Sequence, residues 1–260
     1  MRRSKVLHKL RNGRFARFCA LGHYIPFFVR HAAHFGFDGI WLDLEHRAMD
    51  DREVQALLAA CHASDIDCMV RPPTLGRTRL YRYLEDGAAG LMVPFVNTAA
   101  IARGVVESTK FPPLGERGVD GAGLDGGFYV DVLGADSTYF ADANRETFIV
   151  AQIETREAIR NVREIAAVPG IDLLFVGPAD LGLRMSAGPE EGRISLDEAV
   201  ERVRAAAREH GKAWGITAGT VEDLARYRAL GAQLIPRGSD YWLMKVLEEC
   251  SRDFDGLPGE

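Results

Sequence analysis

Residues 39–51 read GIWLDLEHRAMDD, and this stretch begins like a core β-strand but ends in charge. Its apolar first half suits a strand that is covered on both faces, as in a parallel sheet. Asp43, Glu45 and His46 then place three ionisable groups where the strand ends. Such a pattern predicts either a helix cap at the surface or a strand that delivers side chains to a functional site.

The same pattern of an apolar run followed by an amphipathic stretch recurs along the chain and predicts parallel strands linked by helices. Eight β/α units in 260 residues favour a single-domain α/β protein, a (β/α)8 TIM barrel over residues 1–260, with a doubly wound open sheet as the alternative. The predicted strands are residues 17–22, 39–44, 67–71, 90–95, 148–153, 172–177, 212–217 and 232–237.

Three predicted helices begin with the spacing of a capping box. In this motif the cap side chain and the third helical residue each bond the other's backbone N–H. The pairs are Asp50 with Glu53, Ser195 with Glu198, and Thr220 with Asp223. These signals place helix starts directly after the predicted strands.

One long segment interrupts the alternation after the fourth β/α unit. Residues 111–145 are rich in glycine and in turn-forming residues. Long loops inside compact domains are usually functional, so we expect this segment to cover a site.

Composition narrows the class of partner and the location. The net charge is -5 with both signs interspersed, which argues against nucleic acid and anionic membranes and favours a small molecule. No apolar run approaches the roughly 20 residues that cross a bilayer. The four cysteines show no CxxC spacing and the first residues do not resemble a signal peptide, so we expect a reduced, cytoplasmic protein.

Polar residues follow several predicted strands at their carboxyl ends, where the active sites of such barrels lie. Arg71 ends the third strand, Gln152 and Glu154 end the fifth, and Asp180 follows the sixth. Each has a structural alternative: Arg71 as an ion-pair partner, Glu154 as a helix-dipole residue and Asp180 as a helix cap. Their joint position favours a site.

These residue types suit proton chemistry beside a carbonyl group. Two carboxylates without a histidine or cysteine pair at ligand spacing fit a hard divalent cation such as Mg²⁺ or Mn²⁺. Arg71 offers a planar fork to an oxyanion, and His46, oriented by Asp43, could move a proton near neutral pH. A lysine imine is the alternative, but none of the five lysines is predicted at the carboxyl end of a strand.

At this point the chain resembles the HpcH/HpaI family of metal-dependent, class II pyruvate aldolases, whose relatives include 2-keto-3-deoxy sugar-acid aldolases. The resemblance rests on motifs that occur in order along nearly the whole chain. They are GFDGIWLDLEH, the VRP around Arg71, GAAGLMVPFVNT, FPPLGERGV, QIET and GPADL.

The resemblance implies a barrel assembled as a trimer of domain-swapped dimers, exchanged through the last helix, and cleavage of a 2-keto-4-hydroxy acid to pyruvate and an aldehyde. It assigns the metal (Mg²⁺, Mn²⁺ or Co²⁺) to Glu154 and Asp180, the keto oxygen to Arg71 and the proton to His46 with Asp43. Gln152 lies nearby, and the pyruvate carboxylate falls to the backbone of Gly177, Pro178, Ala179 and Asp180.

Two other functions remain open. One is carbon–carbon cleavage of a coenzyme A ester, as in citrate lyase β-like proteins, which would want a basic nucleotide-binding surface. The other is a non-catalytic barrel that binds a phosphorylated metabolite through the segments TAGTV and RGSD.

The chain departs from the family on the side that would hold the aldehyde. Thr217 stands where relatives often have leucine, and the long loop offers glycines and Asp125 where they often have an arginine. If the loop closes over the site, Asp125 would repel a distal carboxylate. We therefore expect a neutral, hydroxylated aldehyde, with Thr217 bonding one of its hydroxyl groups.

Overall fold

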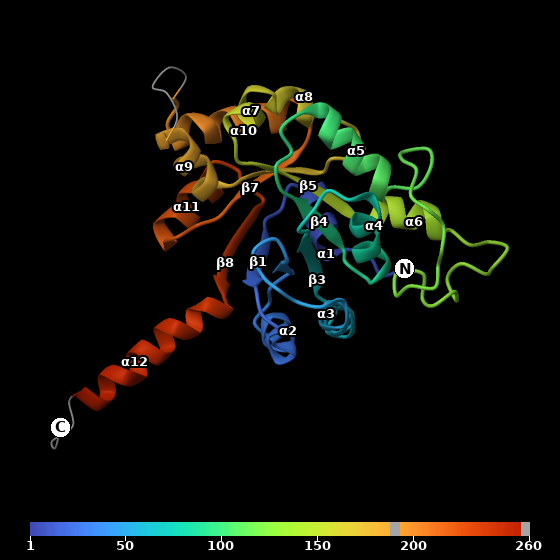
Figure 1. Cartoon of the computed structure of the whole chain (residues 1–260), viewed down its shortest axis with the longest axis horizontal. Coiled ribbons are helices and arrows are strands. Elements are labelled where there is room, and N and C mark those ends of the chain that lie inside the picture. Colours follow the sequence, from blue (N-terminus) through green and yellow to red (C-terminus); the bar gives the residue numbers. More distant parts are fainter. Residues whose placement is uncertain (188–192, 256–260) are drawn as a thin grey trace.

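The computed structural model describes residues 1–187 and 193–255, and it confirms the TIM barrel. Eight parallel strands close in sequence order, β1 pairing with both β2 and β8 (Figure 1). Their bounds are β1 (Ala16–Leu21), β2 (Gly39–Asp43), β3 (Asp67–Arg71), β4 (Gly90–Val93), β5 (Phe148–Ile153), β6 (Leu173–Val176), β7 (Ala213–Ile216) and β8 (Leu234–Ser239). The predicted strands agree with these bounds to within two residues at either end.

Helices follow the strands and form the outer layer (Figure 1). They are α1 (Lys5–Arg11), α2 (Pro26–His34), α3 (Asp51–Ala63), α4 (Arg77–Glu85), α5 (Ala99–Thr109), α6 (Tyr139–Glu146), α7 (Arg156–Arg160), α8 (Val162–Ala166), α9 (Pro178–Ala187), α10 (Leu196–Glu209), α11 (Val221–Ala229) and α12 (Leu243–Asp255), with a 3-10 turn η1 (Asp240–Trp242) before the last. All three predicted capping boxes are confirmed, at the starts of α3, α10 and α11.

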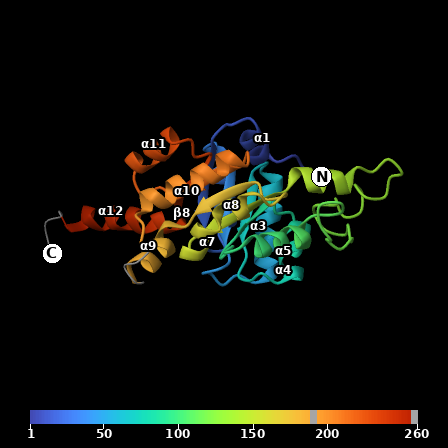
Figure 2. The same cartoon turned by 90° about the horizontal axis from the view of Figure 1, so that it is seen from above.

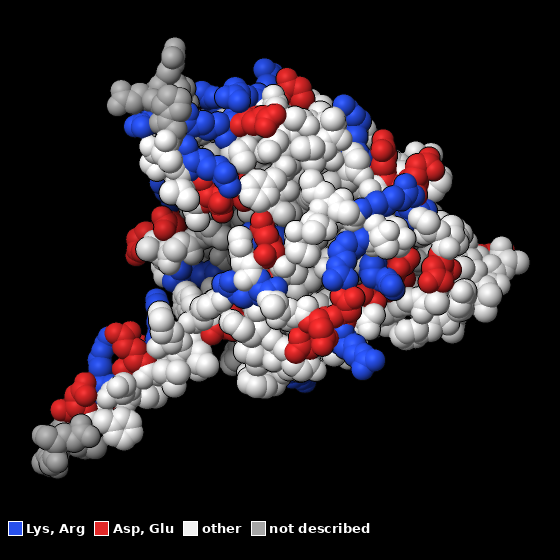
Figure 3. All heavy atoms as spheres, viewed as in Figure 1, with Lys and Arg blue, Asp and Glu red and all other residues white. Residues whose placement is uncertain are grey.

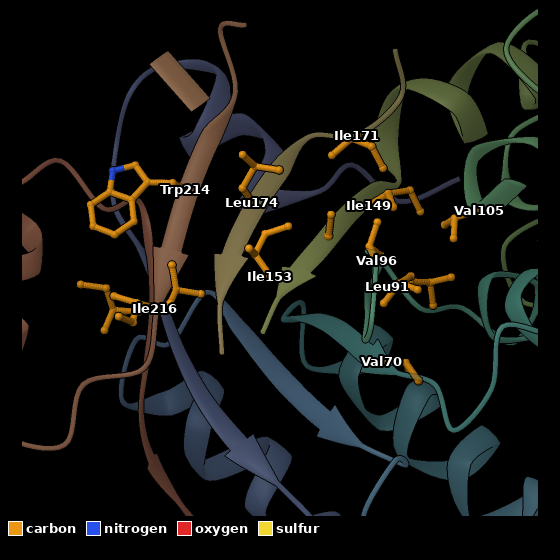
Figure 4. Packing of buried hydrophobic residues seen from close by; sticks show 14 of the residues in the cluster. Val70, Leu91, Val96, Val105, Ile149, Ile153, Ile171, Leu174, Trp214 and Ile216 are labelled. Atoms are coloured by element: carbon orange, nitrogen blue, oxygen red, sulfur yellow. The ribbon is translucent and has the colours of Figure 1, made fainter. Parts of the chain in front are cut away.

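Two apolar layers hold the barrel together. The layer between strands and helices includes Leu91, Ile153 and Ile216 (Figure 4). The other fills the barrel interior, where alternate residues of the strands such as Phe148 and Phe175 meet buried side chains of α1. Because α1 closes the amino ends of the strands, only the carboxyl ends open to solvent.

The glycine-rich segment differs from its prediction in extent and in place. Residues 111–138 hold no helix or strand, but α6 begins at Tyr139, inside the predicted loop. The segment projects from the side of the barrel opposite α12 (Figure 2). Its Asp125 N–H donates to the carbonyl of Glu85 at 3.3 Å, and its Asp131 pairs with the amino terminus of Met1 at 2.5 Å. It therefore packs near the amino ends of the strands.

The last helix, α12, leaves the barrel and makes no cover for it (Figures 1 and 2). None of its thirteen residues is buried, and Leu243, Met244 and Leu247 are exposed large apolar side chains. A groove of about 590 Å³ remains beside β1, β8 and α11, lined by apolar residues that include Phe15, Phe37 and Ile235. This is the place that an eighth covering helix would occupy.

Two further observations concern the surface. On the face in Figure 3, acidic and basic side chains are interspersed, as the sequence predicted. None of the helices among residues 1–187 and 193–255 combines the length and the apolar content needed to cross a lipid bilayer.

Candidate active site

Arg71, the last residue of β3, is fixed inside the mouth of the barrel by two acidic neighbours. Its Nε and Nη2 donate to the two carboxylate oxygens of Asp43 at 2.9 and 2.7 Å, and its Nη1 lies 3.1 Å from Oε2 of Glu45. The guanidinium carbon lies 4.7 Å from the ring centroid of Trp41. Although burial acts to raise the pKa of Asp43, the bonds and charge of Arg71 lower it. The planar cation is thus held in one orientation.

Glu154 lies across the mouth, just past β5, and is fully buried. Its Oε1 accepts the backbone N–H of Phe95 at 2.9 Å, and its Oε2 accepts from Nε2 of Gln152 at 2.5 Å. Burial raises the pKa of Glu154 to about 7, and the carboxylates of Glu45 and Asp180 act in the same direction. The group is held in place but lacks enough positive charge nearby.

The start of α9 packs against this carboxylate. A Cβ atom at Gly177 would lie 3.0 Å from Oε2 of Glu154 and 3.1 Å from Nε2 of Gln152, so only glycine leaves the pair undisturbed. Asp180 lies within the first turn of α9 and is half-buried, which corrects the alternative that it caps the helix from outside. The segment therefore brings a second carboxylate toward Glu154.

The same helix start offers backbone donors to an anion. The first hydrogen bond within α9 runs from the N–H of Leu181 to the carbonyl of Gly177, so the N–H groups of Ala179 and Asp180 precede the helical ladder. Pro178 fixes the backbone of the first position without using a donor. Orphan N–H groups at a helix start suit a carboxylate.

The acidic residues fit a hard cation, although they do not form a complete cage by themselves. Among residues 1–187 and 193–255, no three His, Cys, Asp or Glu side chains converge closely enough to hold a metal ion. Glu154 and Asp180 nevertheless supply oxygen donors and repel each other. Oε1 of Gln152 is buried without a partner beside them. Oxygen donors with excess negative charge match Mg²⁺-like ions, which keep several water ligands.

Several buried polar atoms at this end of the barrel lack a hydrogen-bond partner. Among the described residues they include Nε1 of Trp41, Nε of Arg47, Oε1 of Gln152 and Oδ1 of Asp240, while Nε of Arg117 and Oδ1 of Asp125 are unbonded in the long loop near the other end. Buried polar groups are nearly always bonded in folded proteins, so such a concentration marks a place where a ligand supplies the missing partners.

The predicted dyad of Asp43 and His46 is wrong in one respect. Both oxygens of Asp43 bond Arg71, and Asp43 reaches only the backbone N–H of His46, at 3.4 Å. The exposed ring of His46 lies 3.6 Å from Oε2 of Glu45 instead. Asp43 therefore orients the arginine, and a catalytic role of His46 stays a prediction.

The expected contribution of Asp125 is also wrong. Its carboxylate is fully buried in the long loop, where it bonds Arg117 at 2.7 Å and the hydroxyl of Tyr139 at 2.8 Å. It lies near the amino ends of the strands, so it cannot repel a substrate at the mouth of its own barrel. Thr217, by contrast, directly follows β7 and is half-buried at the carboxyl end.

Sequence reasoning overlooked two contributors to the site, Trp41 and Phe95, and gave Glu45 no partner. Trp41 and Glu45 share a face with Asp43 through the two-residue period of a strand, a signal that could have linked them. Phe95 contributes its backbone N–H and has a φ of +53°, which is unusual for a residue with a side chain. A main-chain donor leaves no signature in the residue type.

The lysines lie where the sequence predicted. Lys110 is buried at the amino end of β5, donating to the carbonyl and hydroxyl of Thr147, and Lys212 precedes β7. Lys5 and Lys9 belong to α1, and Lys245 to α12. All five stand away from the carboxyl ends of the strands, so none is placed to form an imine in the mouth.

Comparison with known proteins gives a consistent result. Residues 21–245 match the family described as HpcH/HpaI aldolase/citrate lyase. The chain is 36% identical to the 5-keto-4-deoxy-D-glucarate aldolase of Klebsiella pneumoniae, covering 85% of this chain and 84% of that protein. It is 35% identical to the hydroxypyruvate/pyruvate aldolase of Pseudomonas aeruginosa, covering 97% and 93%.

A solved structure agrees with the sequence relatives. The HpcH/HpaI aldolase from Desulfitobacterium hafniense superposes with a TM-score of 0.87 at 30% identity, covering 97% of both chains.

Proposed function

The chain belongs to the HpcH/HpaI aldolase/citrate lyase family, and we propose that it reversibly cleaves a 2-keto-4-hydroxy acid to pyruvate and an aldehyde. The supporting observation is the mouth of the barrel. There a fixed guanidinium faces buried carboxylates, and several buried polar atoms lack partners. Such a preorganised site stabilises negative charge that develops on a keto oxygen during cleavage.

The residues divide the substrate between them in this proposal. Arg71 donates to the keto oxygen, with its fork aimed by Asp43 and Glu45. The N–H groups of Ala179 and Asp180, in the segment 177–180, bind the carboxylate of the pyruvate half, since Pro178 has no N–H and that of Gly177 donates to Ile153. Thr217 contacts the aldehyde half from β7, and Gln152 holds Glu154 in place.

Activity is proposed to depend on a divalent cation, Mg²⁺, Mn²⁺ or Co²⁺, held by Glu154 and Asp180. When bound, such an ion acts as a Lewis acid toward the keto and carboxylate oxygens. The raised pKa of Glu154 supports this assignment, because a cation would stabilise a carboxylate that burial, and then the charges of Glu45 and Asp180, now disfavour.

Proton exchange at the methyl group of pyruvate tests the proposal. Nuclear magnetic resonance in D₂O should show enzyme-dependent deuteration that stops after chelation and returns with Mn²⁺, Co²⁺ or Mg²⁺. Exchange that survives exhaustive chelation, or covalent trapping of pyruvate by borohydride, would contradict it.

Binding of a phosphorylated metabolite finds less support. The start of α11, near the candidate segment TAGTV, is already filled by its capping box, since Thr220 and Asp223 bond each other's backbone N–H. Glu222 and Asp223 add negative charge in the first turn, which opposes an incoming phosphate. The named relatives at about 35% identity are aldolases, which also favours cleavage of a hydroxy acid over a coenzyme A ester.

We propose that the protein is a homo-oligomer, a hexamer built as a trimer of dimers that exchange α12. The exposed apolar residues of α12 and the uncovered groove beside β1 and β8 are complementary surfaces within each chain. The groove also presents Arg17, Arg228 and Arg237, whereas the outer half of α12 carries Glu248 and Asp253. Light scattering of the chain truncated after Asp240 should show smaller particles than the full chain.

A cytoplasmic location is the remaining part of the proposal. All four cysteines are free, and Cys19, Cys61 and Cys68 are buried. Free buried thiols are typical of proteins kept in a reducing compartment. Fractionation of the native host, with the protein in the soluble cell extract, is the expected outcome.

A further inference from the structure

A second aspartate–histidine pair stands at the mouth, and it has the geometry that Asp43 and His46 lack. His23 follows β1, and Asp240 follows β8, the neighbouring strand. Nδ1 of His23 lies 2.7 Å from Oδ2 of Asp240, whose side chain is only 3% exposed, while the ring is 57% exposed. A buried carboxylate thus holds an accessible imidazole.

The bond fixes which ring nitrogen is available. Asp240 also accepts the backbone N–H of Gly22 at 3.1 Å, so its orientation does not depend on the histidine. A carboxylate accepting from Nδ1–H leaves Nε2 as the free, basic nitrogen. Carboxylate and imidazole in this order form the base of many enzymes. The edge of the His23 ring also meets the ring of Tyr241, 5.4 Å between centroids, which limits its rotation.

Strand register places this pair on the rim of the same mouth. Leu21 of β1 pairs with Leu42 of β2, so Gly22 is level with Asp43, which holds Arg71. With neighbouring strands about 4.8 Å apart, β1 lies roughly 10 Å from β3 along the rim. In the closed order of eight strands, β1 stands opposite β5, which carries Glu154.

The surroundings of the pair are also incomplete. Oδ1 of Asp240 and Nε of Arg47 are buried without hydrogen-bond partners. Arg47 connects the two regions, because its side chain lies 3.1 Å from where a Cβ of Gly22 would stand and its guanidinium carbon lies 4.8 Å from the ring centroid of Tyr241. Buried polar atoms without hydrogen-bond partners therefore lie beside both β2 and β8.

Resting on the aldolase function proposed above, we propose that His23, held by Asp240, exchanges the proton of the C4 hydroxyl group of the substrate. The pyruvate half is placed between β3 and β6, which directs C4 toward the opposite rim. In cleavage, the hydroxyl proton passes to Nε2 of His23 and the C4–O bond becomes a carbonyl. The C3–C4 bond breaks, and its electron pair enters the enolate of pyruvate. The imidazolium then releases the proton to solvent, and C3 of the enolate takes its proton from water in a step that does not involve His23.

The proposal separates two reactions that one assay can compare. Exchange at the methyl group of pyruvate needs only the part of the site that binds pyruvate. Addition of pyruvate to D-glyceraldehyde also needs a group that donates a proton to the new hydroxyl oxygen. His23→Ala should lower kcat for addition by about 10²–10⁴-fold, the usual range for loss of a general acid–base group. Pyruvate exchange should stay near the wild-type rate, and added imidazole should restore addition.

Four further variants control the experiment. Asp240→Asn should lower kcat for addition more than it changes KM, because the ring of His23 loses the carboxylate that orients it. His23→Gln fills more of the space of the imidazole than His23→Ala and should preserve the fold if the alanine variant does not. His31→Ala removes an exposed histidine of α2 away from the strand ends and should change neither rate. His46→Ala should show no rescue by imidazole.

The outcomes distinguish this inference from the function on which it rests. Wild-type protein without pyruvate exchange or addition would contradict the aldolase function itself. Active wild-type protein together with fully active His23→Ala would overturn only the role of His23. Loss and imidazole rescue in His46→Ala, with normal His23→Ala, would assign the proton to His46 instead.

Discussion

The two ends of the barrel differ in how completely their buried charged side chains are hydrogen-bonded. At the amino end, Asp67 is fully buried and accepts from the hydroxyl of Ser4 at 2.6 Å and the N–H of Val6 at 2.9 Å, with Arg2 also bonded to it. Lys110 donates to the carbonyl and the hydroxyl of Thr147, and to a third oxygen. Burial raises the pKa of Asp67 and lowers that of Lys110 to about 8, but all the polar atoms of these two side chains are bonded.

At the carboxyl end, buried polar groups are left short of partners. Gln152 and Asp240 each keep one oxygen unbonded, and Glu154 is surrounded by more negative than positive charge. A completed network stabilises a fold, whereas an incomplete one reserves its bonds for a ligand. Substitutions at the two ends should therefore change different properties: stability at the amino end and catalysis at the carboxyl end.

The largest effect is expected at the carboxyl end, for Glu154→Gln. The variant keeps the shape but removes the charge, so pyruvate exchange should fall by about 10³-fold, the upper end of the loss for one electrostatic stabiliser. The melting temperature should stay constant or rise, because a repelled buried charge is gone. Calorimetry and methyl exchange on the same sample measure both; a lower melting temperature with normal exchange would break the comparison.

Arg71→Lys comes next, with an expected loss of about 10²–10³-fold in kcat/KM for addition of pyruvate to D-glyceraldehyde. A lysine keeps the charge but cannot bond both oxygens of Asp43 while offering a third N–H to a keto oxygen. Steady-state kinetics checks it. Near-normal turnover would identify Arg71 as a structural ion-pair residue.

Asp67→Ala tests the amino end and should destabilise the protein by about 3–5 kcal/mol, the usual cost of breaking a buried ion pair. The N–H of Val6 and the hydroxyl of Ser4 would lose their acceptor. Asp65→Asn is the matched control: it removes the charge of an exposed partner of the same Arg2, keeps a residue type tolerated at the positive φ of position 65, and should cost less than about 1 kcal/mol. Urea unfolding measures both, and kcat of the folded fraction should not change; equal losses for the two variants would contradict the contrast.

The smallest effect is expected for Gly177→Ala. The added methyl group must push Glu154 or Gln152 aside, which should destabilise the fold by about 1–3 kcal/mol. Displacement of the carboxylate should lower the exchange rate by roughly tenfold or more. Gly182→Ala, in open space on α9, should leave the rate unchanged and slightly stabilise the helix. An unaltered rate in Gly177→Ala would show that the carboxylate has room to move.

Most of the fold could be predicted from the sequence because local signals and the global fold agree. The strand at residues 67–71 and the capping box of Asp50 with Glu53 follow from patterns within a few residues. The long loop could not be placed, because its position depends on contacts such as Asp131 with Met1, which are 130 positions apart. The glycine content of the loop does not predict on which side of the barrel the loop lies.

The candidate site was predicted in position but not in pairing. The ends of β2, β3, β5 and β6 supply the predicted polar residues, since strand order fixes which ends meet. The partner of each side chain depends on geometry that the sequence does not specify. Asp43 had two candidates within reach, His46 three positions along the chain and Arg71 on the next strand, and the register of β2 with β3 favours the arginine. His23 stands directly after the first predicted strand, but its pairing with Asp240, 217 positions away, gave no local signal.

The extended α12 bears on how this protein would complete its fold. A chain whose eighth covering helix points away leaves its apolar groove open until another helix arrives. If that helix comes from a second chain, the final step of folding is bimolecular, and its yield rises with protein concentration. Dilution alone would then increase the fraction of chains that are incompletely folded. Mixed chains with unlike last helices could likewise trap one another in incomplete pairs.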